Sequence, residues 1–547
     1  MIRLTELRLP LDHDAAALRG AVLRRLGVPD AALRHVSVFR RGYDARNPRA
    51  IMLVYTLDVE AEDEAGLLAH TPQLRKSPDT RYRAPAQAPA NAPRPIVIGT
   101  GPCGLLAALS LAQMGFRPLI LERGTVVRDR TKDTWALWRR GVLAAESNVQ
   151  FGEGGAGTFS DGKLYSGIKD PRHYGRKVLE EFVKAGAPEE ILYVSKPHIG
   201  TFRLVTMVES IRAEIERLGG EYRFGTKVVD LLLDAERRVQ GVVTAAGEHI
   251  PARQVVLAIG HSARDSFAML HDRGVCLEQK PFSIGVRIEH PQRLIDAVRF
   301  GPNAGNPLLG AADYKLVHHA TNGRSVYSFC MCPGGQVVAA ASEPGGVVTN
   351  GMSQYSRAER NANAGLVVAV TPADYPGDVL AGVEFQRRLE SAAFEAGGGG
   401  YRAPGQRVED FLAGRASTSL GSVIPSYQPG VTPTDLARVL PDWAVVAMRE
   451  ALRAFDRDIP GFAMADAVMT GVETRTSSPL RIRRGFDFES LNTPGLYPAG
   501  EGAGYAGGIL SAGVDGLRVA AALALTATGQ EVPREMSRGA GSDITYG

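Results

Sequence analysis

The sequence predicts an α/β protein in which a doubly wound parallel sheet carries an inserted β-rich domain and a small N-terminal α+β module. Three observations indicate this architecture: a glycine-rich turn between a buried strand and a helix, alternating strands beyond residue 281, and a proline-rich seam at residues 84–95. A chain of 547 residues is too long for one hydrophobic core, so several domains are expected.

Composition narrows the functional classes. Charged residues make up 22% of the chain and the formal net charge is +4 without a long basic run, which disfavours nucleic-acid binding. No uninterrupted apolar stretch of about eighteen residues occurs, so no membrane partner is expected. The four cysteines (Cys103, Cys276, Cys330 and Cys332) do not form a disulfide framework, which favours a reducing, cytoplasmic location. The oligomeric state stays open.

The small N-terminal module is expected over residues 1–83. Its stretches "IRLTELRLPL", "DAAALRGAVLRRLG", "HVSVFRRGYDAR" and "AIMLVYTLDVE" predict the order strand, helix, strand, strand, with the helix packed on an antiparallel sheet. The stretch "APAQAPANAPRP" at residues 84–95 predicts an extended linker. The module carries no recognisable chemistry, and a structural appendage, a docking role and a lid are all compatible with it.

The strand "PIVIG" leads into a G-x-G-x-x-G turn and the helix "LLAALSLAQMG", a pattern that predicts a dinucleotide pyrophosphate at the helix N-terminus. Gly99 permits the tight turn, Gly101 lets the backbone approach a phosphate, and Gly104 allows close helix–strand packing. Pro102 and Cys103 lie inside this turn, where the cysteine fills space rather than reacts.

The next strand, "RPLILE", ends at Glu122, eighteen residues after Gly104. A carboxylate there can accept hydrogen bonds from both ribose hydroxyls and would repel a 2′-phosphate, which argues against NADP at this site. Arg123 follows directly and is included in the predicted cofactor site.

Two later segments resemble the cofactor domain of flavoproteins of the glutathione-reductase class and favour FAD over NAD. In "GLYPAGEGAGYAGGIL", the resemblance implies that the acid bonds the ribityl chain and that the following helix N-terminus faces the flavin pyrimidine, where it favours negative charge. The strand "RQVVLAIG" resembles the one that returns beneath the cofactor. The residues assigned to FAD from these segments are Val228, Ile259, Gly260, Gly500, Glu501, Gly507, Gly508 and Ile509.

Longer motifs carry a more specific resemblance. The stretches "NVQFGEGGAGTFSDGKLYSG", "CMCPGGQVV", "NGMSQYSRAERNANAG" and "VETRTSSPLRIRR", together with the C-terminal glycine helix, resemble a bacterial family of uncharacterised FAD-dependent dehydrogenases. The resemblance covers nearly the whole chain. It implies a single Rossmann-type FAD-binding domain of the glutathione-reductase superfamily and leaves the substrate open.

The glycine-rich loop at residues 148–167 is predicted to pass close to the flavin ring, because it offers backbone N–H groups and short donors without bulky side chains. A flexible surface loop is the alternative. Its lysine could support an anionic reduced flavin or a substrate carboxylate, or be solvated. The predicted contacts are Gly154, Gly155, Gly157, Thr158, Ser160, Asp161 and Lys163.

These assignments divide the chain into a discontinuous FAD-binding domain at residues 96–280 and 456–530, and a β-rich substrate domain at 281–455. A polar, glycine-rich C-terminal tail is expected at residues 531–547. No second G-x-G-x-x-G follows a strand, so a nicotinamide coenzyme that reduces the flavin would bind only transiently.

Candidates for catalysis are fewer. Cys330 and Cys332 should point to one face of a strand, and a bridge between them would be strained; both are expected to be structural, with Cys332 the more probable to touch substrate or flavin. His198 is the candidate proton donor. Arg475 is either an anion-binding residue or the partner of Glu473. No metal site is predicted.

The predicted function is an FAD-dependent oxidoreductase that transfers hydride between an unidentified small molecule and flavin N5. Two alternatives stay open: a monooxygenase that uses transiently bound NAD(P)H and oxygen, and a flavin-bearing binding or assembly protein without turnover.

Overall fold

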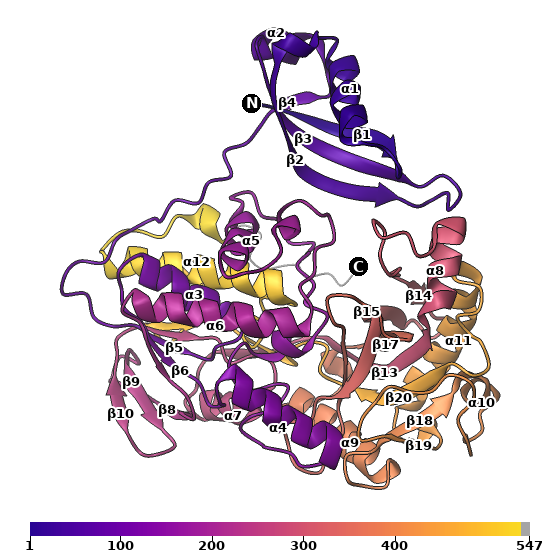
Figure 1. Ribbon diagram of the computed structural model, residues 1–547. Coiled ribbons are helices and arrows are strands. Elements are labelled where there is room, and N and C mark those ends of the chain that lie inside the picture. Colours follow the sequence, from indigo (N-terminus) through magenta and orange to yellow (C-terminus); the bar gives the residue numbers. More distant parts are fainter. Residues whose placement is uncertain (538–547) are drawn as a thin grey trace.

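The computed structural model describes residues 1–537 and confirms the predicted α/β class (Figure 1). A parallel sheet and a larger, mostly antiparallel sheet lie side by side, and the N-terminal module stands apart from both. The parallel sheet has the strand order β22 (Leu496–Pro498), β11 (Val255–Leu257), β5 (Ile96–Ile98), β6 (Leu119–Leu121) and β7 (Glu221–Arg223).

Both faces of the parallel sheet are covered, which is why its strands read as continuous apolar runs. In β5, Val97 packs in the core on the helical face, whereas Ile96 and Ile98 point to the opposite core. The helical face is covered by α3 (Pro102–Gln113), α5 (Tyr174–Lys184), α6 (Thr201–Arg217) and α12 (Ile509–Ala527). The other face is covered by β8 (Val228–Leu233), β9 (Val239–Thr244) and β10 (His249–Pro251).

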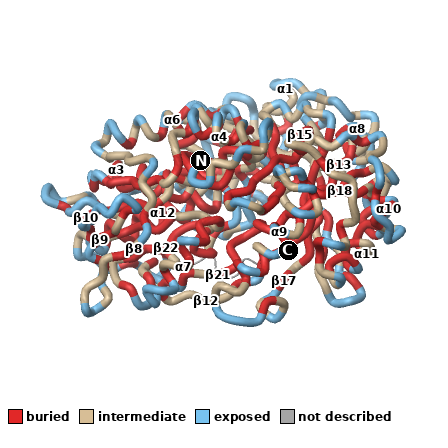
Figure 2. The backbone as a smooth tube through the Cα atoms, turned by 90° about the horizontal axis from the view of Figure 1, so that it is seen from below, coloured by how far each residue is buried: buried red, intermediate tan, exposed pale blue. Residues whose placement is uncertain are grey.

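Helix α12 is long and apolar enough to cross a membrane by length and composition, although 89% of its most apolar window is buried. It packs against α3 in the core of the cofactor domain. Asp515 and Arg518 interrupt its apolar run. A search for uninterrupted apolar stretches therefore does not detect this helix. Figure 2 shows that buried residues gather along the sheets and α12, with exposed residues at the periphery. Its burial identifies α12 as a core helix.

The larger sheet forms the second domain. Its order is β14 (Val317–His319), β15 (Ser325–Ala339), β17 (Asn361–Val370), β13 (Phe282–Pro291), β20 (Val468–Glu473), β18 (Ala403–Arg407) and β19 (Val431–Pro433), with β16 (Thr349–Met352) paired to β15. Within this sheet, over the described residues, β18 and β19 are the one parallel pair. Helices α8 (Gln292–Phe300), α10 (Val408–Ala413) and α11 (Asp442–Asp458) share one hydrophobic core with it.

The expected domain boundary after residue 455 differs from the structure. Strand β20 lies between β13 and β18 in the large sheet, so the chain returns to the cofactor domain only after Glu473. The two-stranded pair of β12 (Leu277–Gln279) and β21 (Leu480–Ile482) lies where the chain leaves and re-enters that domain. The sequence missed this because β20 precedes the "TRTSSP" turn without any break that marks a domain edge.

The N-terminal module is a four-stranded antiparallel sheet in the order β2 (Leu33–Asp44), β3 (Met52–Ala61), β1 (Ile2–Pro10) and β4 (Leu74–Lys76). Helix α1 (Ala15–Leu26) begins at Asp14, whose carboxylate accepts the Ala17 N–H, and ends at a left-handed Gly27. The sequence analysis did not predict the short α2 (Glu64–His70) or β4. Strand β2 reaches the main body, where the Arg41 N–H donates to the Tyr193 carbonyl at 2.6 Å.

The linker at residues 84–95 has no helix or strand, as its prolines predict. It is nevertheless packed, because Ala86 and Ala92 are buried in the cofactor-domain core and the Ala88 N–H donates to the Met114 carbonyl at 2.8 Å. Of the predicted tail, residues 538–547 lie outside the described range, while Met536 is buried in the same core.

We predict that Phe455→Ala lowers the free energy of unfolding by about 3–5 kcal/mol, because it empties a fully buried position between α11 and the large sheet. Val446→Ala on the exposed side of the same helix should cost less than about 0.5 kcal/mol. Urea denaturation measures both. Equal effects of the two substitutions would contradict the assigned core.

Candidate functional site

A cavity of about 360 Å³ opens at the carboxyl ends of the parallel strands, within the range typical of small-molecule sites. Gly99, Glu122, Ala258 and Ala499 follow β5, β6, β11 and β22 directly, and all four line it. Between β5 and β11 the strand order reverses direction, which is where open α/β sheets bind their ligands. The opposite wall comes from β15, β16 and the turn after β20.

Most of the residues that the sequence assigned to the cofactor meet in this cavity. Those that line it are Gly99, Gly101, Pro102, Cys103, Glu122, Arg123, Gly155, Gly157, Ser160, Asp161, Lys163, Val228, Ile259, Gly260, Glu501, Gly507, Gly508 and Ile509. Gly104, Gly154, Thr158 and Gly500 do not line it. Gly500 instead donates its N–H to Asp515 at 2.7 Å. Val228, at the start of β8, and Gly260, after β11, are 32 residues apart and both line the cavity.

Close backbone approach shapes the turn after β5. A Cβ on Gly104 would lie 2.0 Å from the Gly99 carbonyl oxygen, and one on Gly155 would lie 2.6 Å from Gly101 Cα. Gly101 differs: it has φ −64° and ψ 177°, and a Cβ there would come no closer than 3.7 Å to the neighbouring chain. The space in front of Gly101 therefore belongs to the cavity.

Two helix N-termini face the cavity. Helix α3 begins after Gly101 and α12 after Gly508, and no side chain within residues 1–537 caps the first N–H groups of either helix. Free N–H groups and the helix dipole attract negative charge or a polar acceptor at both places. A Cβ on Gly507 or Gly508 would meet nothing within 4 Å, so the approach to α12 is open.

Glu122 has a structural task that the sequence did not indicate. Its Oε2 accepts the Thr100 N–H at 3.0 Å and the Thr100 hydroxyl at 2.6 Å, and its Oε1 accepts the N–H groups of Gly124 and Gly152 at 2.9 and 3.0 Å. The carboxylate thus joins the first glycine turn to the 148–167 loop. A ribose hydroxyl would have to share these oxygens, so the ribose contact stays a prediction.

The 148–167 loop is held rather than flexible. Arg130 of α4 (Val127–Arg140) is fully buried and donates to the carbonyls of Asn148, Val149 and Glu153 at 2.7–2.8 Å. Three carbonyls around one guanidinium fix the backbone that lines the cavity. No sequence pattern points to Arg130, because its helix is mostly polar and its partners are main-chain atoms.

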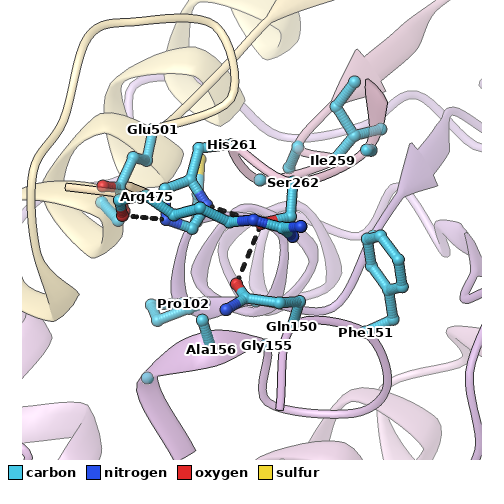
Figure 3. Close-up of a pocket in the computed structure, with 18 of the residues that line it drawn as sticks. Pro102, Gln150, Phe151, Gly155, Ala156, Ile259, His261, Ser262, Arg475 and Glu501 are labelled. Atoms are coloured by element: carbon cyan, nitrogen blue, oxygen red, sulfur yellow. Dashed lines mark hydrogen bonds between the residues drawn. The ribbon is translucent and has the colours of Figure 1, made fainter. Parts of the chain in front are cut away.

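A hydrogen-bonded row of polar side chains crosses one wall (Figure 3). The Ser262 hydroxyl lies 3.0 Å from Gln150 Oε1 and 3.2 Å from His261 Nδ1, and His261 Nε2 lies 2.9 Å from the Arg475 carbonyl oxygen. Because a carbonyl only accepts, Nε2 carries the proton. Burial, together with the Arg475 cation, lowers the pKa of His261 to about 4. All four residues line the cavity, and sequence reasoning had named only Arg475.

Of the two alternatives for Arg475, the pair with Glu473 is wrong. Arg475 donates to Glu390 at 3.0 Å and to Ser342, whereas Glu473 forms a buried bidentate pair with Arg287. Glu473 ends β20 and Arg475 lies in the turn that follows, so their side chains point to different neighbours. Each therefore pairs with a residue from another element. Burial raises the pKa of Glu473 to about 7 even against the neighbouring Arg287.

Neither predicted catalytic residue lines the cavity. Cys332 is fully buried, and His198 is held by the Tyr355 carbonyl 2.9 Å from its Nε2 and by stacking on the Tyr355 ring. Burial lowers the pKa of His198. Cys330 lines the cavity instead. The regular alternation assumed for this strand is broken by a bulge, which separates the two cysteines onto different surroundings.

Glu501 and Lys163 differ in whether a hydrogen-bond or ion-pair partner from the protein contacts the charged group. No hydrogen bond reaches the Glu501 carboxyl within residues 1–537, and burial raises its pKa to about 7. Lys163 lies 2.9 Å from Asp161 and contacts the Met331 carbonyl, so its cation is held by the chain. Although burial lowers the pKa of Lys163, the Asp161 charge more than offsets this and raises it. In the described part of the chain, no cluster of three or more His, Cys, Asp or Glu side chains could hold a metal ion.

The cavity, with two uncapped helix N-termini at the strand ends of a doubly wound sheet, defines a nucleotide-cofactor-binding protein. A family model described as "FAD-dependent protein, C-terminal domain-like" matches residues 281–476, and a model of a domain of unknown function, DUF8436, matches residues 1–60. An uncharacterized protein from Clostridium beijerinckii is 46% identical over 533 residues, which is 95% of this chain and 98% of that protein. The chain belongs to this family of FAD-dependent proteins, and the predicted cofactor, FAD, is confirmed.

Among solved structures, glycine oxidase from Geobacillus kaustophilus is 12% identical, with 82% of this chain and 98% of that chain covered and a TM-score of 0.36. A flavoprotein/dehydrogenase from Cytophaga hutchinsonii is 11% identical, with 82% of each chain covered and a TM-score of 0.37. At TM-scores below 0.5, these likenesses support no statement about activity.

The residues of the cavity fit FAD. The α3 N-terminus and the open space at Gly101 suit a pyrophosphate, and the α12 N-terminus suits the polar edge of the flavin ring. The hydroxyl of Thr349, which lines the cavity, is buried without a hydrogen-bond partner within residues 1–537. Such an unpaired group is costly unless a ligand satisfies it. The Glu501 carboxyl, which interacts electrostatically with Lys280, lines the same cavity.

We predict that Gly101→Ala weakens FAD binding at least about tenfold, or ~1.4 kcal/mol, while leaving the apoprotein as stable as the unsubstituted chain. The new methyl group fits the empty turn but occupies the space in front of the α3 N-terminus. Gly167→Ala, in open space outside the cavity, is the matched control. Quenching of flavin fluorescence gives the affinities. Unchanged affinity in Gly101→Ala would place the pyrophosphate elsewhere.

The stability of the apoprotein should fall as pH rises from about 4.5 to about 7, in part because of Glu501. Its pKa is raised from 4.5 to about 7, so the folded state keeps a proton that the unfolded chain has already lost. Glu501→Gln should flatten this decline, whereas Glu236→Gln, at an exposed position, should not. Melting temperatures measured across this window test the assignment, and parallel curves for Glu501→Gln and the unsubstituted chain would refute it.

Proposed function

We propose that this protein is an FAD-dependent oxidoreductase that transfers hydride between a carbon of a small-molecule substrate and flavin N5. One observation carries the proposal: a single cavity is lined by the ends of the parallel strands and also by Cys330, Thr349 and Asn350 of the large sheet. A cofactor bound at the strand ends would turn its reactive ring toward a wall that belongs to the other domain. A substrate bound against that wall would lie beside the ring.

Bound FAD would supply the two-electron chemistry. The chain supplies position and charge. Glu501, with a pKa near neutrality, can hold or release a proton at its carboxyl group, and the α12 N-terminus stabilises negative charge that develops nearby. His261 is kept neutral by burial, so Ser262 and Gln150 present a fixed hydrogen-bond pattern rather than a mobile charge.

The cations of the cavity wall favour an uncharged or weakly charged substrate over a strongly anionic one. Arg475 is bound to the buried carboxylate of Glu390, and Lys163 is bound to Asp161. Arg287, which lies outside the lining, is bound to Glu473. A substrate carboxylate would have to displace an internal acid from one of them, which is unfavourable for a buried pair. This favours the structural reading of Arg475 and of Lys163 over an anion-binding role.

The test is a screen of metabolites against the oxidised holoprotein without oxygen. We expect at least one compound to bleach the flavin absorbance and to be recovered as its two-electron oxidation product. Bleaching by NADH or NADPH, followed by a hydroxylated product when oxygen is admitted, would indicate the monooxygenase instead. A flavin that stays oxidised with every donor, although dithionite reduces it, would indicate a binding or assembly protein.

A further inference from the structure

The two cysteines of the "CMC" motif occupy a distorted part of β15 at the cavity wall. Phe329 pairs with Gly365 and Cys332 with Asn363, so residues 330 and 331 oppose a single residue of β17. Cys330 has φ +41°, which a side chain other than glycine rarely adopts. The bulge presents Cys330 to the cavity and leaves Cys332 buried directly behind it. Backbone strain of this kind gathers at functional sites.

The two thiols are within reach of one another. Cys332 Sγ lies 3.3 Å from the Cys330 carbonyl oxygen. That oxygen is about 2.4 Å from its own Cα, so Cys332 Sγ lies at most about 5.7 Å from Cys330 Cα. The two side chains also contact each other directly, and this contact is the largest cause of the shifted pKa of each thiol.

Cations hold the backbone between the cysteines. Arg287 Nη1 donates to the Cys330 carbonyl at 2.8 Å, and Lys163 Nζ contacts the carbonyl of the next residue, Met331. The hydrogen bond with the Cys332 thiol, together with the Lys163 and Arg287 charges, lowers the pKa of Cys330 well below its ordinary value. The pKa of Cys332 is raised by the same contact and by burial. The lowered pKa favours the thiolate at Cys330, on the cavity side, and the raised pKa favours the thiol at Cys332 behind it.

We propose that Cys330 and Cys332 are a redox-active pair that exchanges two electrons with FAD bound in the same cavity. The proposal rests on the proposed function, since it needs a flavin that turns over. A Cys330 thiolate and a Cys332 thiol form one S–S bond. The two electrons pass to oxidised FAD and the Cys332 proton goes with them, which gives the singly protonated, anionic reduced flavin. No other oxidant is required, and the reverse step regenerates the thiolate and the thiol.

A reductive titration counts the electrons directly. Holoprotein that has been reduced and then reoxidised in air is titrated with dithionite without oxygen, while the flavin absorbance is followed. We expect about four electrons per FAD, two for the flavin and two for the disulfide. Cys330→Ser should take up about two with its flavin still bound, and Cys276→Ser, a half-buried cysteine outside the cavity, should keep about four.

A second readout needs neither a substrate nor a variant. The same samples are denatured in an alkylating reagent and the fragment that contains both cysteines is weighed. After reduction, we expect the fragment to carry two alkyl groups. After reoxidation, we expect it to carry none and to be lighter by two hydrogens than the unmodified dithiol fragment. In protein stripped of FAD, air should leave both thiols alkylatable.

An uptake of two electrons per FAD in the unsubstituted protein, with both thiols alkylatable in every state, would overturn the inference. The proposed function would survive that result if a substrate still bleaches the flavin. If every compound in the metabolite screen failed but the titration still took up four electrons, the redox pair would stand and the proposed function would fall.

Discussion

The site depends on one constraint, the close approach of two glycine-rich backbones. Gly155 lies so near Gly101 that a single methyl group on Gly155 would come within 2.6 Å of the other chain. This contact sets the 148–167 loop beside the α3 N-terminus. Glu122 then joins the two segments, because it accepts two hydrogen bonds from Thr100 and one from Gly152, and Arg130 holds the loop from behind. The cavity is therefore built by main-chain atoms whose positions are fixed before any ligand arrives.

The charges around the cavity are already paired within the protein. The Arg287–Glu473 pair joins two strands of the large sheet, and the Arg475–Glu390 pair joins β20's following turn to α9 (Ala381–Ala396). Breaking such a buried pair leaves an uncompensated charge, so these residues keep the wall in one arrangement. The side chains left for a ligand at this wall are few, and Thr349 and Glu501 are among them.

The sequence predicted the parts of the fold that are encoded locally. The roles of Gly99 and Gly104 follow from spacing, because the turn and its helix are adjacent in the chain, and the structure places both as expected. Contacts between distant segments left no such trace: nothing near Arg130 indicates three carbonyl acceptors, and nothing near His261 indicates Ser262 and Gln150 as one network. Strand alternation predicted Cys330 and Cys332 on one face, with Cys332 preferred because it is next to the Pro-Gly-Gly turn. The structure separates them, because alternation assumes a regular strand and one extra residue breaks it, and Cys330 lines the cavity.

Electron density from crystals of the FAD-loaded protein tests the central claim most directly. The account predicts one FAD per chain, with its pyrophosphate at the α3 N-terminus and its ring system between the α12 N-terminus and Cys330 of β15. An FAD bound outside this cavity, or a ring turned away from the large sheet, would contradict it.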